Sequence, residues 1–183
     1  MHGGVVSRRI CNLITSFNEY DCSLKLMSLV MLSRAADIAE PEFPAAETGD
    51  GERMLRILVV DDHPTNRRVV ELMLEQVGVI IASAENGAEA CEAFEAGRFD
   101  VILMDVQMPV MDGLTATRNI RAYEAAQHLG RTPILILTAH SQPEDIDASQ
   151  AAGADQHLTK PLHPAVLFSA LQQALEGDLR ATG

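Results

Sequence analysis

Side chains that could bind a metal ion and a phosphoryl group follow four short apolar runs of the sequence. Asp61 and Asp62 come directly after one run, Asp105 after a second, Thr138 after a third, and Lys160 after a fourth, shorter one. Because the carboxyl ends of parallel strands meet at one edge of a sheet, we expect these five side chains to gather there. Three carboxylates, a hydroxyl and an ammonium on one rim would suit a divalent cation and a phosphoryl group.

Each of these residues also has an ordinary structural explanation when it is considered alone. An Asp after a strand commonly caps the next helix or begins a turn, and a Lys is usually solvated. Three carboxylates brought together, however, repel one another unless a hard cation bridges them. Mg²⁺ prefers oxygen ligands and keeps several waters, so two or three carboxylates suffice to bind it. The combination of Asp61, Asp62 and Asp105 therefore predicts a Mg²⁺ site.

Strand and helix patterns alternate along the chain from about residue 55 onward. Apolar runs predict five strands, near residues 57–60, 79–82, 101–104, 134–137 and 155–159. Helical patterns bounded by Gly and Pro predict five helices, near residues 64–76, 88–96, 114–127, 143–152 and 163–176. This alternation predicts a doubly wound α/β domain, in which helices cover both faces of a parallel sheet and the crossovers are right-handed.

The composition of the 183-residue chain limits the class of protein. The chain is 47% hydrophobic and 22% charged, as is usual for a globular protein. Its formal net charge of −12 argues against a nucleic-acid-binding surface. Cys11, Cys22 and Cys91 have neither a C-x-x-C spacing nor a paired His, which favours a reducing compartment over a zinc site or a disulfide framework. No stretch reaches the roughly eighteen apolar residues of a membrane span, so we expect a cytoplasmic protein without membrane contact.

The motifs, taken in order, resemble those of the receiver domain of two-component response regulators, including the receivers of hybrid sensor kinases. They are Asp61-Asp62, the run Met-Asp-Val-Gln-Met-Pro-Val-Met-Asp-Gly around Asp105, Thr138-Ala139 and Lys160-Pro161. The resemblance covers residues 55–176. It implies a CheY-like, flavodoxin-type fold with a five-stranded parallel sheet in the order 2-1-3-4-5.

The resemblance also implies roles for the residues of the rim. Asp105 would be the phosphoacceptor, and Mg²⁺ would bind directly to Asp62, Asp105 and the backbone carbonyl of Gln107, with Asp61 acting mainly through water. Thr138 would donate a hydrogen bond to the phosphoryl group, and Lys160 would pair with its oxygens. Because X-Pro bonds are where cis peptides occur, a cis bond after Lys160 would aim this side chain across the rim.

Three further positions are expected to tune the switch. His157 stands where the family often has a Tyr or Phe whose ring position reports phosphorylation, which predicts a weaker or pH-sensitive aromatic switch. A surface histidine whose polar atoms are satisfied is the alternative. His140 and Gln107 occupy positions that in this family influence how water reaches the acyl phosphate. We therefore expect them to set the rate of dephosphorylation.

The first 54 residues do not follow the strand and helix alternation. Residues 1–38 are an N-terminal extension, helical or disordered, and residues 39–54 are an acidic linker rich in Pro and Gly. Seven apolar residues of the extension have the 3-4 spacing of an amphipathic or coiled-coil helix: Ile10, Leu13, Phe17, Tyr20, Leu24, Met27 and Met31. Alternatively, Met54 is the true start and the extension is an artefact of gene calling. Residues 177–183 are expected to be a C-terminal tail.

The function implied is that of a switch in a two-component phosphorelay, which is not a metabolic enzyme. A histidine kinase or a histidine phosphotransfer protein would supply the phosphoryl group. Only about 23 residues follow Lys160, too few for a DNA-binding output domain, so we expect signalling through contact with an unidentified downstream protein. The alternatives are the receiver portion of a hybrid sensor histidine kinase and a Mg²⁺-dependent phosphohydrolase acting on an external substrate. The sequence leaves open whether phosphorylation drives homodimer formation.

Overall fold

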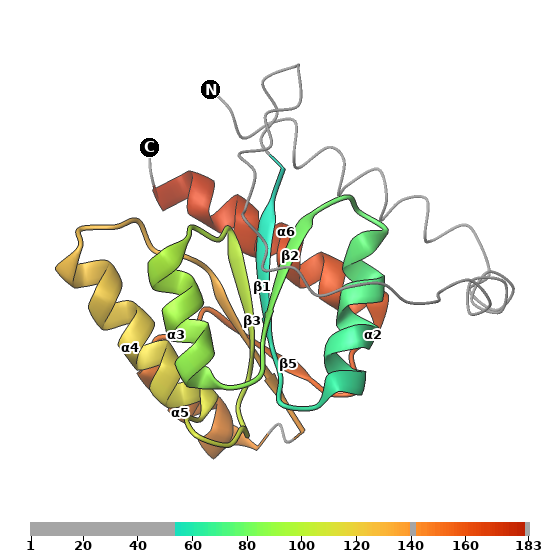
Figure 1. The fold of residues 1–183 in the computed structure, drawn as a ribbon, viewed down its shortest axis with the longest axis horizontal. Helices are drawn as coiled ribbons and strands as arrows, with labels where there is room; N and C mark the ends of the chain where they lie inside the picture. The colour runs from blue at the N-terminus through green and yellow to red at the C-terminus, as the bar shows by residue number, and fades with distance from the viewer. Residues whose placement is uncertain (1–53, 140–141, 182–183) are drawn as a thin grey trace, which may run out of the picture.

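The structure, a computed structural model, describes residues 54–139 and 142–181. The predictions for the N-terminal extension, for the linker up to residue 53 and for His140 concern residues outside this described part. The described residues form five strands and five helices, which alternate along the chain (Figure 1). They are β1 (Arg56–Val60), α2 (Pro64–Glu75), β2 (Ile80–Ala84), α3 (Gly87–Ala96), β3 (Val101–Asp105), α4 (Gly113–Ala126), β4 (Ile134–Thr138), α5 (Pro143–Ala152), β5 (Gln156–Thr159) and α6 (Pro164–Ala181).

The five strands form one parallel sheet in the order β2-β1-β3-β4-β5, as predicted. In the register of the central strands, Val60 of β1 lies beside Met104 of β3, and Asp105 lies beside Leu137 of β4. The carboxyl ends of β1, β3 and β4 therefore come together at one edge of the sheet. This is the edge that the sequence predicted for the charged side chains.

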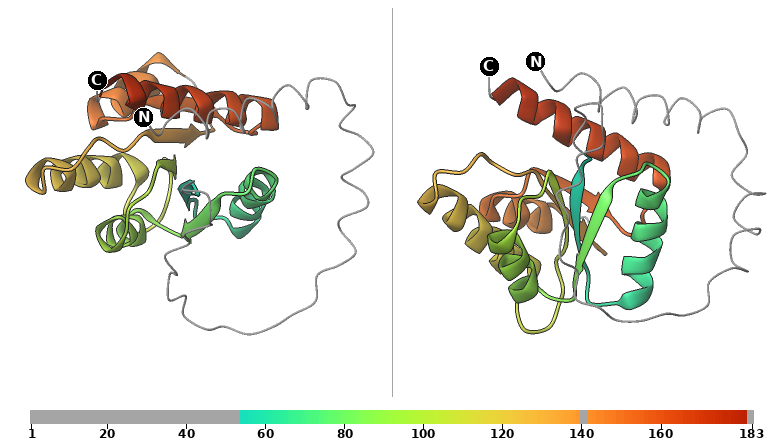
Figure 2. Two further views of the ribbon diagram at one scale, coloured as in Figure 1. Left: turned by 90° about the horizontal axis from the view of Figure 1, so that it is seen from above. Right: turned by 45° about the horizontal axis from the view of Figure 1, so that its top comes forward.

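Helices cover both faces of the sheet, which explains why the central strands are almost uniformly apolar. On one face, α2 and α6 pack over alternate strand residues such as Val59 and Leu103. On the other face, α3 and α4 pack over the intervening residues such as Leu58 and Ile102. Figure 2 shows these two layers of helices with the sheet between them. All five residues of β3 and of β4 are buried, so these strands are a fixed support for the residues at their ends.

The helix starts follow from local sequence. The side chain of Asn86 caps α3 by accepting hydrogen bonds from two backbone amides, and Asp112 caps α4 in the same way at Thr115. Pro64 and Pro143 occupy the first turn of α2 and α5, where no helical amide is needed. His63 is the N-cap residue of α2, but its side chain makes no capping hydrogen bond.

Most boundaries lie within one residue of the predicted ones, and two differ by more. Strand β2 extends to Ala84, two residues beyond the apolar run, because pairing with β1 continues through Val60. Helix α6 continues to Ala181, past the predicted end at residue 176. None of the helices in the described part of the chain is long and apolar enough to cross a membrane.

Candidate functional site

Three carboxylates meet at the carboxyl edge of the sheet. Each of Asp61, Asp62 and Asp105 has a carboxylate oxygen within 4.8 Å of such an oxygen in the other two. Asp61 and Asp105 are buried, whereas Asp62 is exposed. The cluster of three carboxylates is therefore buried on the side toward the sheet and open to solvent on the other side. The sequence prediction that strand ends bring these residues together is confirmed.

Lys160 links the two buried carboxylates. Its Nζ lies 2.6 Å from Asp61 Oδ2 and 2.9 Å from Asp105 Oδ2. The peptide bond from Lys160 to Pro161 is cis, and the Lys160 amide donates to the carbonyl oxygen of Thr138 at 2.7 Å. The ammonium thus reaches across the rim from the end of β5. It neutralises part of the negative charge that the strand ends concentrate there.

Burial and neighbouring charges shift the pKa values of Asp105 and Lys160. Burial raises the pKa of the Asp105 carboxyl above its ordinary value, and the hydrogen bond from Lys160 offsets only part of that effect. Burial alone would lower the pKa of Lys160, but its hydrogen bonds to Asp61 and Asp105 outweigh burial, so this pKa is raised. The raised pKa of Lys160 reflects the two carboxylates beside it, a concentration of negative charge that favours binding of a cation.

The loop after Asp105 folds back against this residue. The amide of Val106 donates to the carbonyl oxygen of Leu137, and the amide of Gly113 donates to the carbonyl oxygen of Val106. A Cβ atom at position 113 would overlap the carbonyl oxygen of Asp105, so this position requires glycine. Gln107 is exposed in this loop. Its role as a carbonyl ligand stays a prediction.

Thr138 completes the rim on the neighbouring strand. It is the last residue of β4, is 6% exposed, and follows Leu137, the register partner of Asp105. Ala139 follows it and is exposed, so a small side chain borders the open side of the rim. Thr138 therefore ends the strand next to the one that ends at Asp105, at the edge where the carboxylates and Lys160 meet.

Comparison with known proteins identifies the family. The model of the response regulator receiver domain matches residues 57–172. This chain belongs to that family. Receiver domains are phosphoacceptor switches, and the described fold and charged rim are those of such a domain.

Relatives of this receiver include parts of much longer sensor kinases. It is 37% identical over 143 residues to the sensor protein GacS of Pseudomonas syringae pv. syringae, an alignment that covers 77% of this chain and 15% of GacS. It is 33% identical over 152 residues to the virulence sensor protein BvgS of Bordetella pertussis, covering 81% of this chain and 12% of BvgS. The chain therefore spans a small fraction of the length of these relatives.

Three solved structures have the same fold. Vibrio cholerae CheY4 has a TM-score of 0.62 at 36% identity, with 67% of this chain and 99% of that chain covered. The receiver domain of the Pseudomonas aeruginosa sensor histidine kinase PA1611 has a TM-score of 0.62 at 38% identity, covering 68% and 99%, and holds a magnesium ion in its active site cleft. The receiver domain of Saccharomyces cerevisiae Ssk1, in complex with the histidine phosphotransfer protein Ypd1, has a TM-score of 0.63 at 27% identity, covering 66% and 88%.

The donor set of this receiver fits Mg²⁺. Carboxylate oxygens are the ligands that this ion prefers, and it retains waters in the positions that the protein does not fill. Asp62 and Asp105 each offer an oxygen to the cluster of three carboxylates, and the exposure of Asp62 gives the ion a route of entry. Lys160 contacts both Asp61 and Asp105, so the expectation that Asp61 acts mainly through water stays a prediction.

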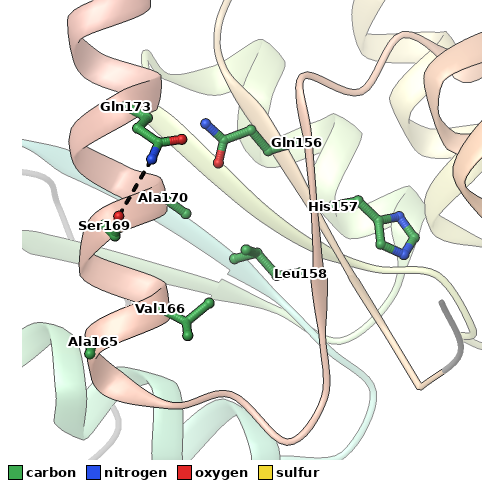
Figure 3. A pocket seen from close by; sticks show the side chains of 8 residues that line it. All are labelled: Gln156, His157, Leu158, Ala165, Val166, Ser169, Ala170 and Gln173. Atoms are coloured by element: carbon green, nitrogen blue, oxygen red, sulfur yellow. Dashed lines mark hydrogen bonds between the residues drawn. The ribbon is translucent and has the colours of Figure 1, made fainter.

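His157 is half-buried and does not have the setting of a solvated surface residue. In Figure 3, Gln156 and Leu158 lie beside α6, whereas the His157 ring points to the opposite side of β5. Its Nδ1 lies 3.3 Å from the hydroxyl oxygen of Ser149 on α5. Nε2 is buried and has no hydrogen-bond partner among the described residues. The ring is thus held between β5 and α5, and its part in the switch stays a prediction.

Two polar residues near the rim were not predicted from the sequence. Asn66 and Arg67, in the first turn of α2, donate to the side chain and to the carbonyl oxygen of Asp61, respectively. Their positions in the sequence could have indicated these contacts. The first turn of a helix that follows a strand end lies beside that end, so polar residues there can contact it.

Proposed function

We propose that this receiver accepts a phosphoryl group on Asp105 from a phosphohistidine, with Mg²⁺ held by Asp62, Asp105 and the carbonyl oxygen of Gln107. The single observation that carries the proposal is the placement of Asp105. It ends a fully buried strand, contacts the ammonium of Lys160, and lies within 4.8 Å of two further carboxylates. A nucleophilic carboxylate beside positive charge is the arrangement that phosphoryl transfer requires.

The residues of the rim have separate tasks in this transfer. An oxygen of the ionised Asp105 carboxylate attacks phosphorus, the new O–P bond forms as the P–N bond to the donor imidazole breaks, and the electron pair of that bond leaves with the imidazole. Bound Mg²⁺ supplies positive charge that stabilises the phosphoryl oxygens. Lys160 leaves Asp105 and pairs with a phosphoryl oxygen, and the Thr138 hydroxyl donates to another. The phosphoryl group carries about 1.5 to 2 negative charges. Because the charge of the Asp105 carboxylate is lost in the new bond, the rim gains about one negative charge or slightly less.

The donor proposed is a histidine phosphotransfer protein or a histidine kinase. Support comes from Ssk1, whose similar receiver domain forms a complex with the phosphotransfer protein Ypd1. The formal net charge of −12 also favours a protein partner over a nucleic acid. Signalling would then follow through contact of the phosphorylated chain with a downstream protein, and homodimer formation is one form that this contact could take.

A second candidate is that the chain functions as the receiver portion of a hybrid sensor kinase. The observation that favours it is the similarity to GacS and BvgS, of which this chain spans 15% and 12%. The sequence of the genomic region around this reading frame decides between the two. A kinase catalytic region read in the same frame, or fused to this chain in the native protein, would establish the hybrid form.

The experiment that tests the acceptor is phosphotransfer from a radiolabelled phosphohistidine protein, with Mg²⁺ or with a chelator. We expect at most one label per chain, dependent on Mg²⁺ and removed by hydroxylamine, as for an acyl phosphate. The variant Asp105→Asn should take no label, and Asp147→Asn, which changes an exposed acid on α5, should be labelled as the wild type is. Label retained on Asp105→Asn would overturn the assignment. Steady hydrolysis of a small phosphate ester beyond one phosphoryl per chain would favour the phosphohydrolase instead.

A further inference from the structure

The carboxylate of Asp61 is held from two directions. Its Oδ2 accepts a hydrogen bond from Lys160 at 2.6 Å. Its Oδ1 accepts two others, from the backbone amide of His63 at 2.9 Å and from Asn66 Nδ2 at 3.2 Å. Because an ionised carboxylate can only accept hydrogen bonds, the nitrogen end of the Asn66 amide must face it. Asn66 is therefore a neutral donor on the oxygen that Lys160 does not use.

The backbone of Asp61 is fixed independently of Asn66. Its amide donates to the carbonyl oxygen of Ala84 at 3.3 Å, which continues the pairing of β1 with β2. Its carbonyl oxygen accepts from Arg67 at 2.7 Å, and the same guanidinium lies 2.6 Å from a carboxylate oxygen of Glu85. What Asn66 contributes is thus the orientation of the side chain, since the main chain at this position is already held.

The two side chains that donate to the Asp61 carboxylate, Lys160 and Asn66, behave differently during phosphoryl transfer. Lys160 also contacts Asp105, and under the function proposed above it moves to the phosphoryl oxygens. Asn66 carries no charge and lies in the first turn of α2, so nothing draws it away from Asp61. When Lys160 leaves, the side-chain donor that remains on Asp61 among the described contacts is Asn66.

We propose that Asn66 is a positioning residue, which holds the Asp61 carboxylate in the orientation needed to bind Mg²⁺ or its waters. Its contribution is largest when Lys160 has moved to another partner. This inference rests on the proposed Mg²⁺ site. Donors that orient the ligands of a metal usually change its affinity by about 10- to 100-fold when they are removed. Asn66 makes one contact of ordinary length, so we expect about a tenfold effect, the lower end of that range.

The test is Mg²⁺ binding by calorimetry, together with competition by Mn²⁺ followed by electron paramagnetic resonance. The variant Asn66→Leu should bind Mg²⁺ about tenfold more weakly than the wild type. Its unfolding midpoint without metal should stay equal or rise, because Asn66 is exposed on a helix and Leu is the better helix former. The matched control is Gln76→Leu, which removes an exposed amide from the far end of the same helix and should leave the Mg²⁺ affinity unchanged.

A second background separates positioning from a general effect on the fold. In Lys160→Met, Asn66 is the remaining side-chain donor on Asp61, so adding Asn66→Leu should weaken Mg²⁺ binding by a larger factor than in the wild type. Equal Mg²⁺ affinity of Asn66→Leu and the wild type would overturn the inference and leave the proposed function standing. Weak binding accompanied by a lower metal-free unfolding midpoint would also overturn it, as a structural effect. A wild type that binds no Mg²⁺ would instead overturn the proposed metal site itself.

Discussion

Replacing Lys160 with Met tests whether the rim is held together by one ammonium. Lys160 lies 2.6 Å from Asp61 and 2.9 Å from Asp105, whose side chains are only 3% and 9% exposed. Met keeps most of the length of the side chain but removes its charge. Two buried carboxylates would then face each other without a counter-charge, an arrangement that the folded state tolerates poorly.

The expected loss of stability in Lys160→Met depends on how deeply Lys160 and its two partners are buried. Removing one partner of a buried ion pair costs about 3 to 5 kcal/mol in free energy of unfolding. Because the Lys160 side chain is 21% exposed, water screens part of this loss, and we expect about 3 kcal/mol, the lower end. The matched control is Arg68→Met. Arg68 also pairs with two carboxylates, Glu71 and Glu75, but its side chain is 55% exposed, so the expected cost is about 1 kcal/mol or less.

The assay is urea unfolding of both variants and the wild type, without metal and with saturating Mg²⁺. Lys160 competes with the cation for the oxygens of Asp61 and Asp105, so the Lys160→Met variant should bind Mg²⁺ more tightly. Each tenfold gain in affinity adds about 1.4 kcal/mol of stability at saturation, which should reduce the deficit of this variant. Equal costs for Lys160→Met and Arg68→Met, or a deficit that Mg²⁺ leaves unchanged, would refute the reasoning.

Two further predictions concern Asp105 and its loop. Gly113→Ala places a methyl group on the carbonyl oxygen of Asp105, so we expect a loss of about 2 kcal/mol or more in urea unfolding, whereas Gly130→Ala, at a position with open space, should cost far less. The raised pKa of Asp105 means that the folded state binds this proton more tightly than the unfolded state, so the contribution of Asp105 to stability falls as the pH rises through that pKa. Asp105→Asn should therefore gain stability over the wild type from pH 4 toward pH 7 in the absence of metal, and a constant difference across that range would contradict the shift.

The parts of the structure that the sequence predicted are those with a periodic or local signal. Val101 to Met104 are apolar because helices cover both faces of β3, and this run ends at Asp105, the last residue of the strand. The position of the proposed acceptor could therefore be predicted from the end of an apolar run. The same reasoning placed Thr138 and Lys160, because parallel strands all end at one edge.

The contacts that the sequence did not reveal depend on side chains that approach one another only in the folded chain. Asn66 reaches Asp61 because α2 begins three residues after Asp61, and no periodic pattern in the sequence indicates that contact. Arg121 on α4 pairs with Glu124 and with Asp155, which lies 34 residues after Arg121 in the sequence. It also donates to the carbonyl oxygen of Gly153. Each partner is an ordinary surface residue by type, so only the packing of α4 beside the start of β5 identifies the group.

The buried strands restrict how a signal can leave the rim. All five residues of β3 and of β4 are buried, and close-packed interiors do not shift continuously without loss of packing. Under the proposed function, a phosphoryl group on Asp105 would not need to move the sheet, because it would offer Lys160 a new partner while Asp61 keeps the amide of His63 and the side chain of Asn66. The residues free to respond are those past the strand ends, beginning with the exposed Ala139. Under the proposed function, the sheet would thus confine the change in charge to the rim loops, where a partner protein could detect it.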